Sequence, residues 1–279
     1  MAAAATEVDF VKLSPTQNMT VLVTSRHAVA DYRSIAAQLL SAGHLQAEQV
    51  GFVRSASTLE AQVRLHMAGD EFCGNACMAL AALTAAELGL GVDDRTDVTL
   101  EASGAEAPLT CRVERRDASY QCELTMPLPG PIEPYPFPGV DAGRSSLVRY
   151  RDAVHLVVES GRHDQALREQ AQEVATRLAA SAGAPVVGVM LYDPARQELT
   201  PLVNVPSLVS MVWERSCGSG TASVGAYLAA TSGAAVRTSV HQPGGTMHVR
   251  ADHGDRGVTG LRISGQVRVV AEGTAYVHG

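Results

Sequence analysis

The chain has 279 residues, a formal net charge of −7, 46% hydrophobic residues and only 4% aromatic residues. This length provides one large domain or two of ordinary size, with a core built from Val, Leu, Ala and Ile. The absence of a basic cluster argues against a nucleic-acid partner, and no apolar run is long enough to cross a bilayer. Residues 1–6 lack the basic and apolar regions of a signal peptide, so we expect a cytoplasmic protein without a membrane partner.

The predicted elements of the first half alternate between short strands and two helices. Hydrophobic runs and turn residues predict strands at 8–13, 19–24, 49–53, 62–67, 98–101, 109–113 and 120–126, with helices at 32–40 and 78–87. Six prolines then fall within residues 127–138. Prolines at this density are incompatible with a central strand or a helix interior, so residues 127–138 predict a domain boundary.

The second half repeats this order of elements. Strands are predicted at 153–158, 186–191, 202–205, 210–213, 236–240, 247–249, 261–263 and 266–270, with helices at 165–180 and 222–230. The pattern predicts two similar α+β halves with a ligand cleft between them, since clefts between domains commonly hold ligands.

Two short segments, one in each half, resemble each other and begin with a cysteine. They read CGNACMA at 73–79 and CGSGTAS at 217–223, and each opens a predicted helix. Unpaired N–H groups and the helix dipole at such a position favour a thiolate, which predicts a base or a nucleophile. Two facing thiols suit a reaction that removes a proton from one side of a carbon atom and returns a proton on the other side.

The remaining cysteines fit neither a disulfide framework nor a metal centre. There are five cysteines in all, an odd number, and reduced thiols are expected in the cytoplasm. Cys73 and Cys77 have a spacing that would suit a metal, but no nearby Cys/His pair completes a zinc set, so no metal is predicted. Cys77, Cys111 and Cys122 are interpreted as buried small hydrophobes.

Small residues after each cysteine could bring backbone N–H groups close to a ligand. Gly74, Asn75, Gly218 and Ser219 fall in the first helical turns, where N–H groups bind carboxylates and stabilise developing negative charge. Further candidate residues have simpler structural alternatives. Glu71 and Glu214 could bind an amino group or orient a thiol, or could be ordinary charges at a helix N-terminus.

Four more candidate residues precede or lie within strands. Asn18 is a binding candidate or a left-handed turn residue, and Glu48 with Gln49 is a binding pair or a polar strand entry. His155 lies in the apolar strand 153–158, where it is either a pocket residue or a hydrogen-bonded core histidine. No dinucleotide, phosphate or pyridoxal fingerprint stands out, so we expect no cofactor.

At these residues the chain resembles the diaminopimelate epimerase-like family of two-cysteine racemases and epimerases. The resemblance rests on EFCGN at 71–75, CGSGTA at 217–222 and PGG at 243–245. It implies two pseudo-symmetric domains, each a curved mixed sheet around a central helix. The expected domains are 1–128, which carries Cys73 and to which 266–279 returns, and 129–265, which carries Cys217.

The sequence is more similar to one branch of that family, the histidine racemases of staphylopine-type metallophore biosynthesis. The shared segments are PTQNMT at 15–20, EQVGF at 48–52, EFCGN at 71–75, WERSCGSGTAS at 213–223 and HQPGG at 241–245. This similarity implies cofactor-independent interconversion of L- and D-histidine, with Cys73 and Cys217 catalytic. The implied substrate-binding residues are Asn18, Glu48, Gln49, Gly74, Asn75, His155, Glu214, Gly218 and Ser219.

Two departures argue against diaminopimelate as the substrate. The chain has QNM at 17–19 where diaminopimelate epimerases have GND, and VVGV at 186–189 where they have an Asn-rich segment. The alternatives that stay open are a racemase or epimerase of another amino acid, including diaminopimelate or a proline derivative, and an amino-acid-binding protein without activity. A thiol redox protein is disfavoured because no Cys-x-x-Cys motif is present. The sequence leaves the oligomeric state open, with a homodimer as one alternative.

Overall fold

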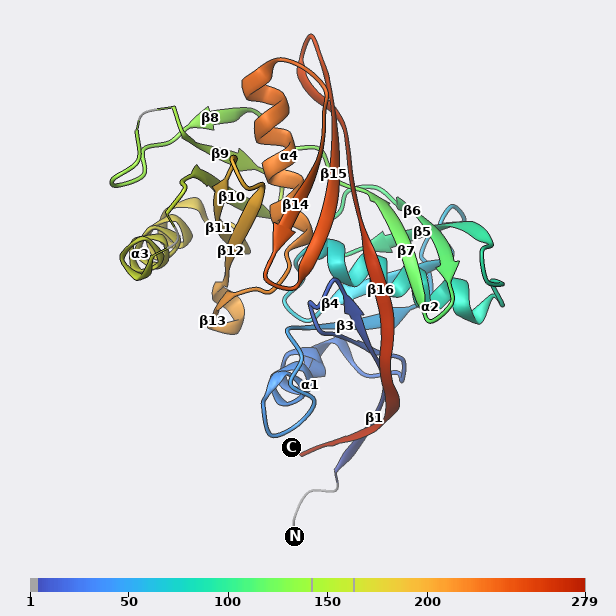
Figure 1. Ribbon diagram of the computed structural model, residues 1–279. Helices are drawn as coiled ribbons and strands as arrows, with labels where there is room; N and C mark the ends of the chain where they lie inside the picture. The colour runs from blue at the N-terminus through green and yellow to red at the C-terminus, as the bar shows by residue number, and fades with distance from the viewer. Residues whose placement is uncertain (1–4, 142, 163, 279) are drawn as a thin grey trace. The chain divides into compact units, whose positions relative to one another are not determined.

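The computed structural model describes residues 5–141, 143–162 and 164–278, which form two compact units (Figure 1). Unit 1 runs up to Leu124 and includes the chain from Gln266 onward, and unit 2 is Thr125–Gly265. Within the described ranges, no helix is both long and apolar enough to cross a membrane.

Unit 1 is a ring of strands around one helix. Its strands are β1 (Thr6–Pro15), β2 (Thr20–Val23), β3 (Gln49–Arg54), β4 (Val63–Met67), β5 (Arg95–Ala102), β6 (Leu109–Arg116), β7 (Ser119–Thr125) and the second part of β16 (Gly257–Val277). They are hydrogen-bonded in the order β1-β2-β3-β4-β5-β6-β7-β16, and β16 also pairs with β1, which closes the ring. The pairs β2–β3 and β4–β5 are parallel.

The helix α2 (Gly74–Glu87) contacts β1 to β6 and is buried on nearly all sides. Its run of alanines allows this position, because small side chains let six strands approach one helix closely. On the other face of β3 lie η1 (Val29–Asp31) and α1 (Tyr32–Leu40), which buries Tyr32, Ile35, Ala36 and Leu39 at helical spacing.

Unit 2 is built from β8 (Ile132–Pro134), β9 (Ser145–Arg149), β10 (Ala153–Glu159), β11 (Val186–Asp193), β12 (Glu198–Val205), β13 (Ser210–Trp213), β14 (Val236–Gln242), β15 (Gly245–Gly254) and the first part of β16. Its strand order is β16-β15-β14-β12-β11-β10-β9-β8, with β13 paired to β12 after η2 (Pro206–Leu208). The pairs β10–β11 and β12–β14 are parallel.

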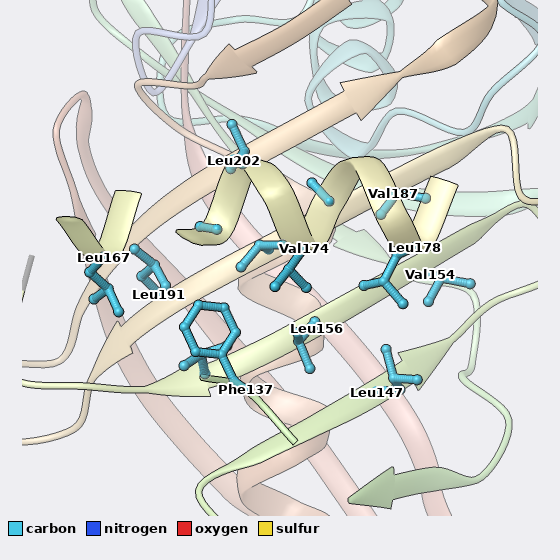
Figure 2. Packing of buried hydrophobic residues seen from close by; sticks show 14 residues of the cluster. Phe137, Leu147, Val154, Leu156, Leu167, Val174, Leu178, Val187, Leu191 and Leu202 are labelled. Carbon is cyan, nitrogen blue, oxygen red and sulfur yellow. The ribbon is translucent and has the colours of Figure 1, made fainter. Parts of the chain in front are cut away.

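The strands β10 and β11 are buried along nearly their whole length because a helix covers each of their faces. Alternate residues such as Leu156 and Val189 pack against α3 (Gln165–Ala182) in the cluster drawn in Figure 2. The residues between them, including His155, belong to the face toward α4 (Gly218–Ser232), which also contacts β14 and β15 (Figure 1).

Most of the predicted elements are confirmed, and the two helices begin directly after Cys73 and Cys217. The structure differs from the prediction in two places. The strands β8 and β9 were not predicted, because both are short and β8 lies within the proline-rich stretch. The predicted strands 261–263 and 266–270 are one continuous strand, β16, because Ser264 still pairs with β15 and Val267 already pairs with β1.

The tight contact between α4 and β15 generates a stability prediction. A methyl group added at Gly225 would clash with both γ-carbons of Val249, whereas one added at Gly43 would meet no atom within 4 Å. We expect Gly225→Ala to lower the free energy of unfolding by about 1–3 kcal/mol, because overpacking outweighs the gain of about 1 kcal/mol in helix propensity. Gly43→Ala is the control and should change it by less than about 0.5 kcal/mol in urea denaturation. An unchanged or higher stability of Gly225→Ala would contradict this packing.

Candidate active site

Cys73 is the N-cap of α2. Its backbone is extended (φ −132°, ψ 107°), and its Sγ accepts a hydrogen bond from the Ala76 N–H at 3.4 Å. The thiol side chain is half-buried, and Gly74 and Asn75 are buried in the first helical turn. The loop before it is tied down, since the Ser103 hydroxyl donates to the Glu71 carbonyl at 2.8 Å.

Cys217 is the N-cap of α4 and has nearly the same geometry (φ −128°, ψ 113°). Its Sγ accepts from the Gly220 N–H at 3.3 Å and lies 3.5 Å from the Ser219 hydroxyl. A side chain at position 220 would place its Cβ 2.6 Å from Met190 Sδ and 3.2 Å from Cys217 Sγ. A residue larger than glycine at this position would therefore require the Met190 side chain to move.

Burial controls the protonation of Cys217, whose side chain is 3% exposed. Desolvation raises the pKa of the Cys217 thiol well above its ordinary value, and the charge of Glu214 raises it further. Hydrogen bonds from Ser219 and Gly220 act in the opposite direction but are outweighed. The prediction that the helix N-terminus favours a thiolate is thus wrong for Cys217 in this state, because burial exceeds the effect of the helix.

Gln242 fixes the start of α4. The Cys217 N–H donates to Gln242 Oε1 at 2.8 Å, and Gln242 Nε2 donates to the Thr221 hydroxyl at 2.9 Å. That hydroxyl donates in turn to the Cys217 carbonyl at 2.7 Å. Sequence reasoning missed this residue because the segment HQPGG was interpreted as a turn. The signal lay in its resemblance to the family, which included the glutamine.

His155 is completely buried beneath the first turns of α4. The single hydroxyl proton of Ser223 goes to the Ser219 carbonyl at 2.9 Å, so His155 Nδ1 at 2.8 Å and the Tyr150 hydroxyl at 3.0 Å are the donors to Ser223 Oγ. His155 Nε2 has no hydrogen-bond partner among the described residues. Burial lowers the pKa of His155 to about 4, so the ring is neutral at pH 7. Neither Tyr150 nor Ser223 was predicted from the sequence.

Asn18 and Glu48 are brought together at the start of the parallel pair β2–β3. Asn18 is fully buried, and its Nδ2 donates to Glu48 Oε2 at 3.3 Å. The alternative of a left-handed Asn18 is wrong, because the residues with positive φ are Thr16 and Gln17 just before it. The turn therefore ends one residue earlier than the sequence suggested.

Gln49 begins β3 beside this pair, and the backbone N–H groups of Glu48 and Gln49 both donate to the Met19 carbonyl, at 2.7 and 3.1 Å. Within unit 1 the structure thus places Asn18, Glu48 and Gln49 together. Within unit 2 it links His155 through Ser223 to the turn that carries Gly218 and Ser219, and it places the charge of Glu214 close enough to Cys217 to shift its pKa.

The other three cysteines are core residues, as predicted. Cys77, Cys111 and Cys122 are completely buried, and all five cysteines are free. The pKa of Cys77 is raised mainly by burial, and that of Cys111 is raised mainly by its hydrogen bond with Cys122 and then by burial. The thiols of Cys77 and Cys111 are therefore poor nucleophiles.

The neutral His155 generates a prediction on stability and pH. Its pKa in the folded state, about 4, lies below its ordinary value of 6.5, so its contribution to stability is complete above pH 6.5 and is lost as the pH falls toward 4. Between pH 7 and pH 5 the loss should be about 2 kcal/mol. We expect His155→Gln to reduce this pH dependence by that amount in urea denaturation, whereas His253→Gln, an equivalent change outside this network, should not.

A second measurement needs no variant and applies even if His155→Gln is too unstable for urea denaturation. Side-chain NMR of the wild-type protein should show no protonation of His155 between pH 7 and pH 5. A His155 resonance that titrates near pH 6.5 would contradict the burial of a neutral ring.

Comparison with known proteins covers almost the whole chain. The family model described as the histidine racemase CntK N-terminal domain matches residues 7–276. A histidine racemase of Staphylococcus aureus is 34% identical over 273 residues, 97% of this chain and 98% of the relative, and one of Fusobacterium nucleatum is 25% identical over 272 residues, 97% of each chain. The crystal structure of a probable proline racemase from Agrobacterium radiobacter has the same fold, with a TM-score of 0.70, 12% identity and coverage of 95% of this chain and 92% of that one. The chain belongs to the histidine racemase family.

Proposed function

We propose that this protein is a cofactor-independent racemase that interconverts L- and D-histidine with two cysteines, Cys73 and Cys217. The observation that carries the proposal is the pair of buried helices α2 and α4, each capped by a cysteine whose sulfur accepts an N–H bond from the first turn. Membership of the histidine racemase family supports histidine as the substrate.

The proposal includes two domains with the same arrangement of strands and helices. The first domain is 1–128 together with 266–279, and the second is 129–265. Its support is the succession of strand pairings. From β1 to β7 the pairs are antiparallel, parallel, antiparallel, parallel, antiparallel and antiparallel. From β9 to β16, leaving β13 aside, the succession is identical. In each succession the capped helix follows the fourth strand.

The proposed reaction is a proton exchange at the substrate's Cα. A cysteine thiolate takes the Cα proton, and the electron pair left on Cα delocalises into the carboxylate. The other thiol then donates its proton to the opposite face of Cα, so that one thiolate and one thiol are present before and after turnover. Burial raises the pKa of the Cys217 thiol in the ligand-free state, which suits Cys217 to the role of the thiol that donates a proton.

The helix starts supply the electrostatic part of the mechanism. The N–H groups of Gly74 and Asn75 in α2, and of Gly218 and Ser219 in α4, belong to the first turns, where a substrate carboxylate is stabilised. The same donors stabilise the charge that builds up as the Cα proton leaves. The two thiols provide both acid and base, so the proposed chemistry requires no pyridoxal phosphate.

Two further parts of the proposal concern the cell. The first is a location in the cytoplasm, which the five free cysteines support because thiols stay reduced there. A role for the D-histidine product in metallophore biosynthesis stays a prediction of the family resemblance.

Substitution of each cysteine tests the two-thiol mechanism. Cys73→Ser and Cys217→Ser should each lower the rate of histidine racemisation by about 100-fold or more, because a serine hydroxyl is a far weaker acid than a thiol. Cys122→Ala, which removes a core thiol, is the control and should keep most of the activity. The measurement is circular dichroism of histidine during turnover, with thermal unfolding to verify folding. Near-normal racemisation by either serine variant would refute the mechanism.

Glu48 is proposed to select histidine, because a carboxylate is the natural acceptor for an imidazole N–H. Glu48→Gln can keep the hydrogen bond from Asn18 but loses the charge, so it should raise the KM for histidine by about tenfold without loss of stability. Glu60→Gln, at an exposed position of the same unit, is the control. Racemisation is to be measured for a panel of L-amino acids. If diaminopimelate or a proline derivative turned over faster than histidine, the substrate assignment would be wrong while the racemase proposal would stand.

A further inference from the structure

Two arginines of unit 1 face each other directly across an antiparallel strand pair. Arg54, the last residue of β3, is the register partner of Arg64 in β4. Like charges in this position destabilise a sheet. Both residues line a cavity of about 730 Å³, and Arg26 and His66 line it as well. This concentration of cationic groups occurs in a chain whose net charge is −7.

In the described residues, two carboxylates pair with this cationic cluster, Glu101 with Arg64 and Asp70 with His66 at 3.1 Å. The carboxylate nearest to Arg64 belongs to Glu101, at 4.0 Å, and it accepts hydrogen bonds from Ser57 and Thr58, which lower its pKa to about 2. Arg54 donates to the backbone carbonyl of His27 at 3.2 Å, which fixes the guanidinium without neutralising it. No ion pair or hydrogen bond of the Arg26 guanidinium is present in the described part of unit 1.

A second cavity adjoins the first and shares His66 and Val29 with it. It measures about 290 Å³ and is lined by Tyr32, a residue that is 2% exposed. The Tyr32 ring stacks on Phe52 and meets the His66 ring edge-on at 5.2 Å. Its buried hydroxyl has no hydrogen-bond partner among the residues that the structure describes, an arrangement that is rare unless a ligand or water supplies one.

These cavities are distinct from the residues assigned to the racemase. Asn18 and Glu48 lie at the start of the parallel strands β2 and β3. The arginines lie at the other end, where Arg54 ends β3 and Arg26 follows β2. The chain then runs along β4 away from the cavity before it reaches Cys73.

We propose that this arginine-lined cavity is a binding site for a small polyanion, a molecule that carries two or more phosphate or carboxylate groups. Guanidinium groups bind such oxyanions through two parallel hydrogen bonds each. Bound anions would neutralise the opposed arginines and offer acceptors near His66. This site is independent of the proposed racemisation.

The test measures binding of inorganic pyrophosphate to the full-length protein by calorimetry at constant ionic strength. Arg54→Gln and Arg26→Gln should each weaken binding by about tenfold. Arg237→Gln is a matched control, because Arg237 also faces an arginine, Arg250, across an antiparallel pair, but there Asp252 lies 3.0 Å from Arg250. This control should change the affinity by less than about twofold. Succinate as a second ligand distinguishes a carboxylate site from a phosphate site, and binding of either supports the proposal.

Two further measurements separate binding from a merely structural role. Arg64→Gln should make the ligand-free protein more stable, because it removes the like-charge pair, and should reduce the stabilisation that pyrophosphate provides. In wild-type protein, pyrophosphate should raise the pKa of His66, which burial lowers, Asp70 at 3.1 Å raises, and the neighbouring Arg64 and Arg54 lower. The proposal is overturned if wild-type protein binds neither anion saturably up to about 10 mM, or if Arg237→Gln loses as much affinity as Arg54→Gln.

Discussion

The structure depends on one constraint, a helix that starts inside the protein. Both α2 and α4 are buried on nearly all sides, including most residues of their first turns. In each helix one of these donors, from Ala76 or Gly220, is taken by the sulfur of the capping cysteine at 3.4 or 3.3 Å. The two sulfur atoms proposed to react are therefore part of the hydrogen bonds that cap the N-terminus of each helix. Their positions are fixed by the fold rather than by a mobile loop.

The same burial sets the electrostatics of unit 2. Helix donors and the Ser219 hydroxyl favour a thiolate at Cys217, while desolvation and Glu214 oppose it, and the opposing effects are larger. His155 is neutral for the same reason. The environment of Cys217 thus suits a group that holds a proton until a substrate arrives. A two-base reaction needs such a group, because one of its two thiols must begin the cycle protonated.

The sequence predicted the elements that have a strong local signal. The Ala-rich runs after Cys73 and Cys217 predicted helices, and the apolar run around His155 predicted a strand. The sequence did not predict the contacts between distant segments, since Gln242 reaches Cys217, and Ser223 reaches His155, only through the fold. It also misjudged the Cys217 thiolate, because a helix start can be recognised locally whereas the depth of its burial cannot. One interpretation of the sequence also placed a left-handed turn residue at Asn18, whereas the positive φ angles are at Thr16 and Gln17. The short polar run 16–18 does not show by itself where the turn ends.

The central claim is that two thiols exchange protons at opposite faces of Cα. The most direct measurement follows L-histidine in D₂O at early conversion and determines the Cα deuterium content of both enantiomers by mass spectrometry after chiral separation. The account predicts that D-histidine carries solvent deuterium while the remaining L-histidine is unlabelled, because the thiol that donates is not the one that accepted. D-Histidine that retains its original Cα hydrogen, or equal labelling of both enantiomers from the start, would contradict it.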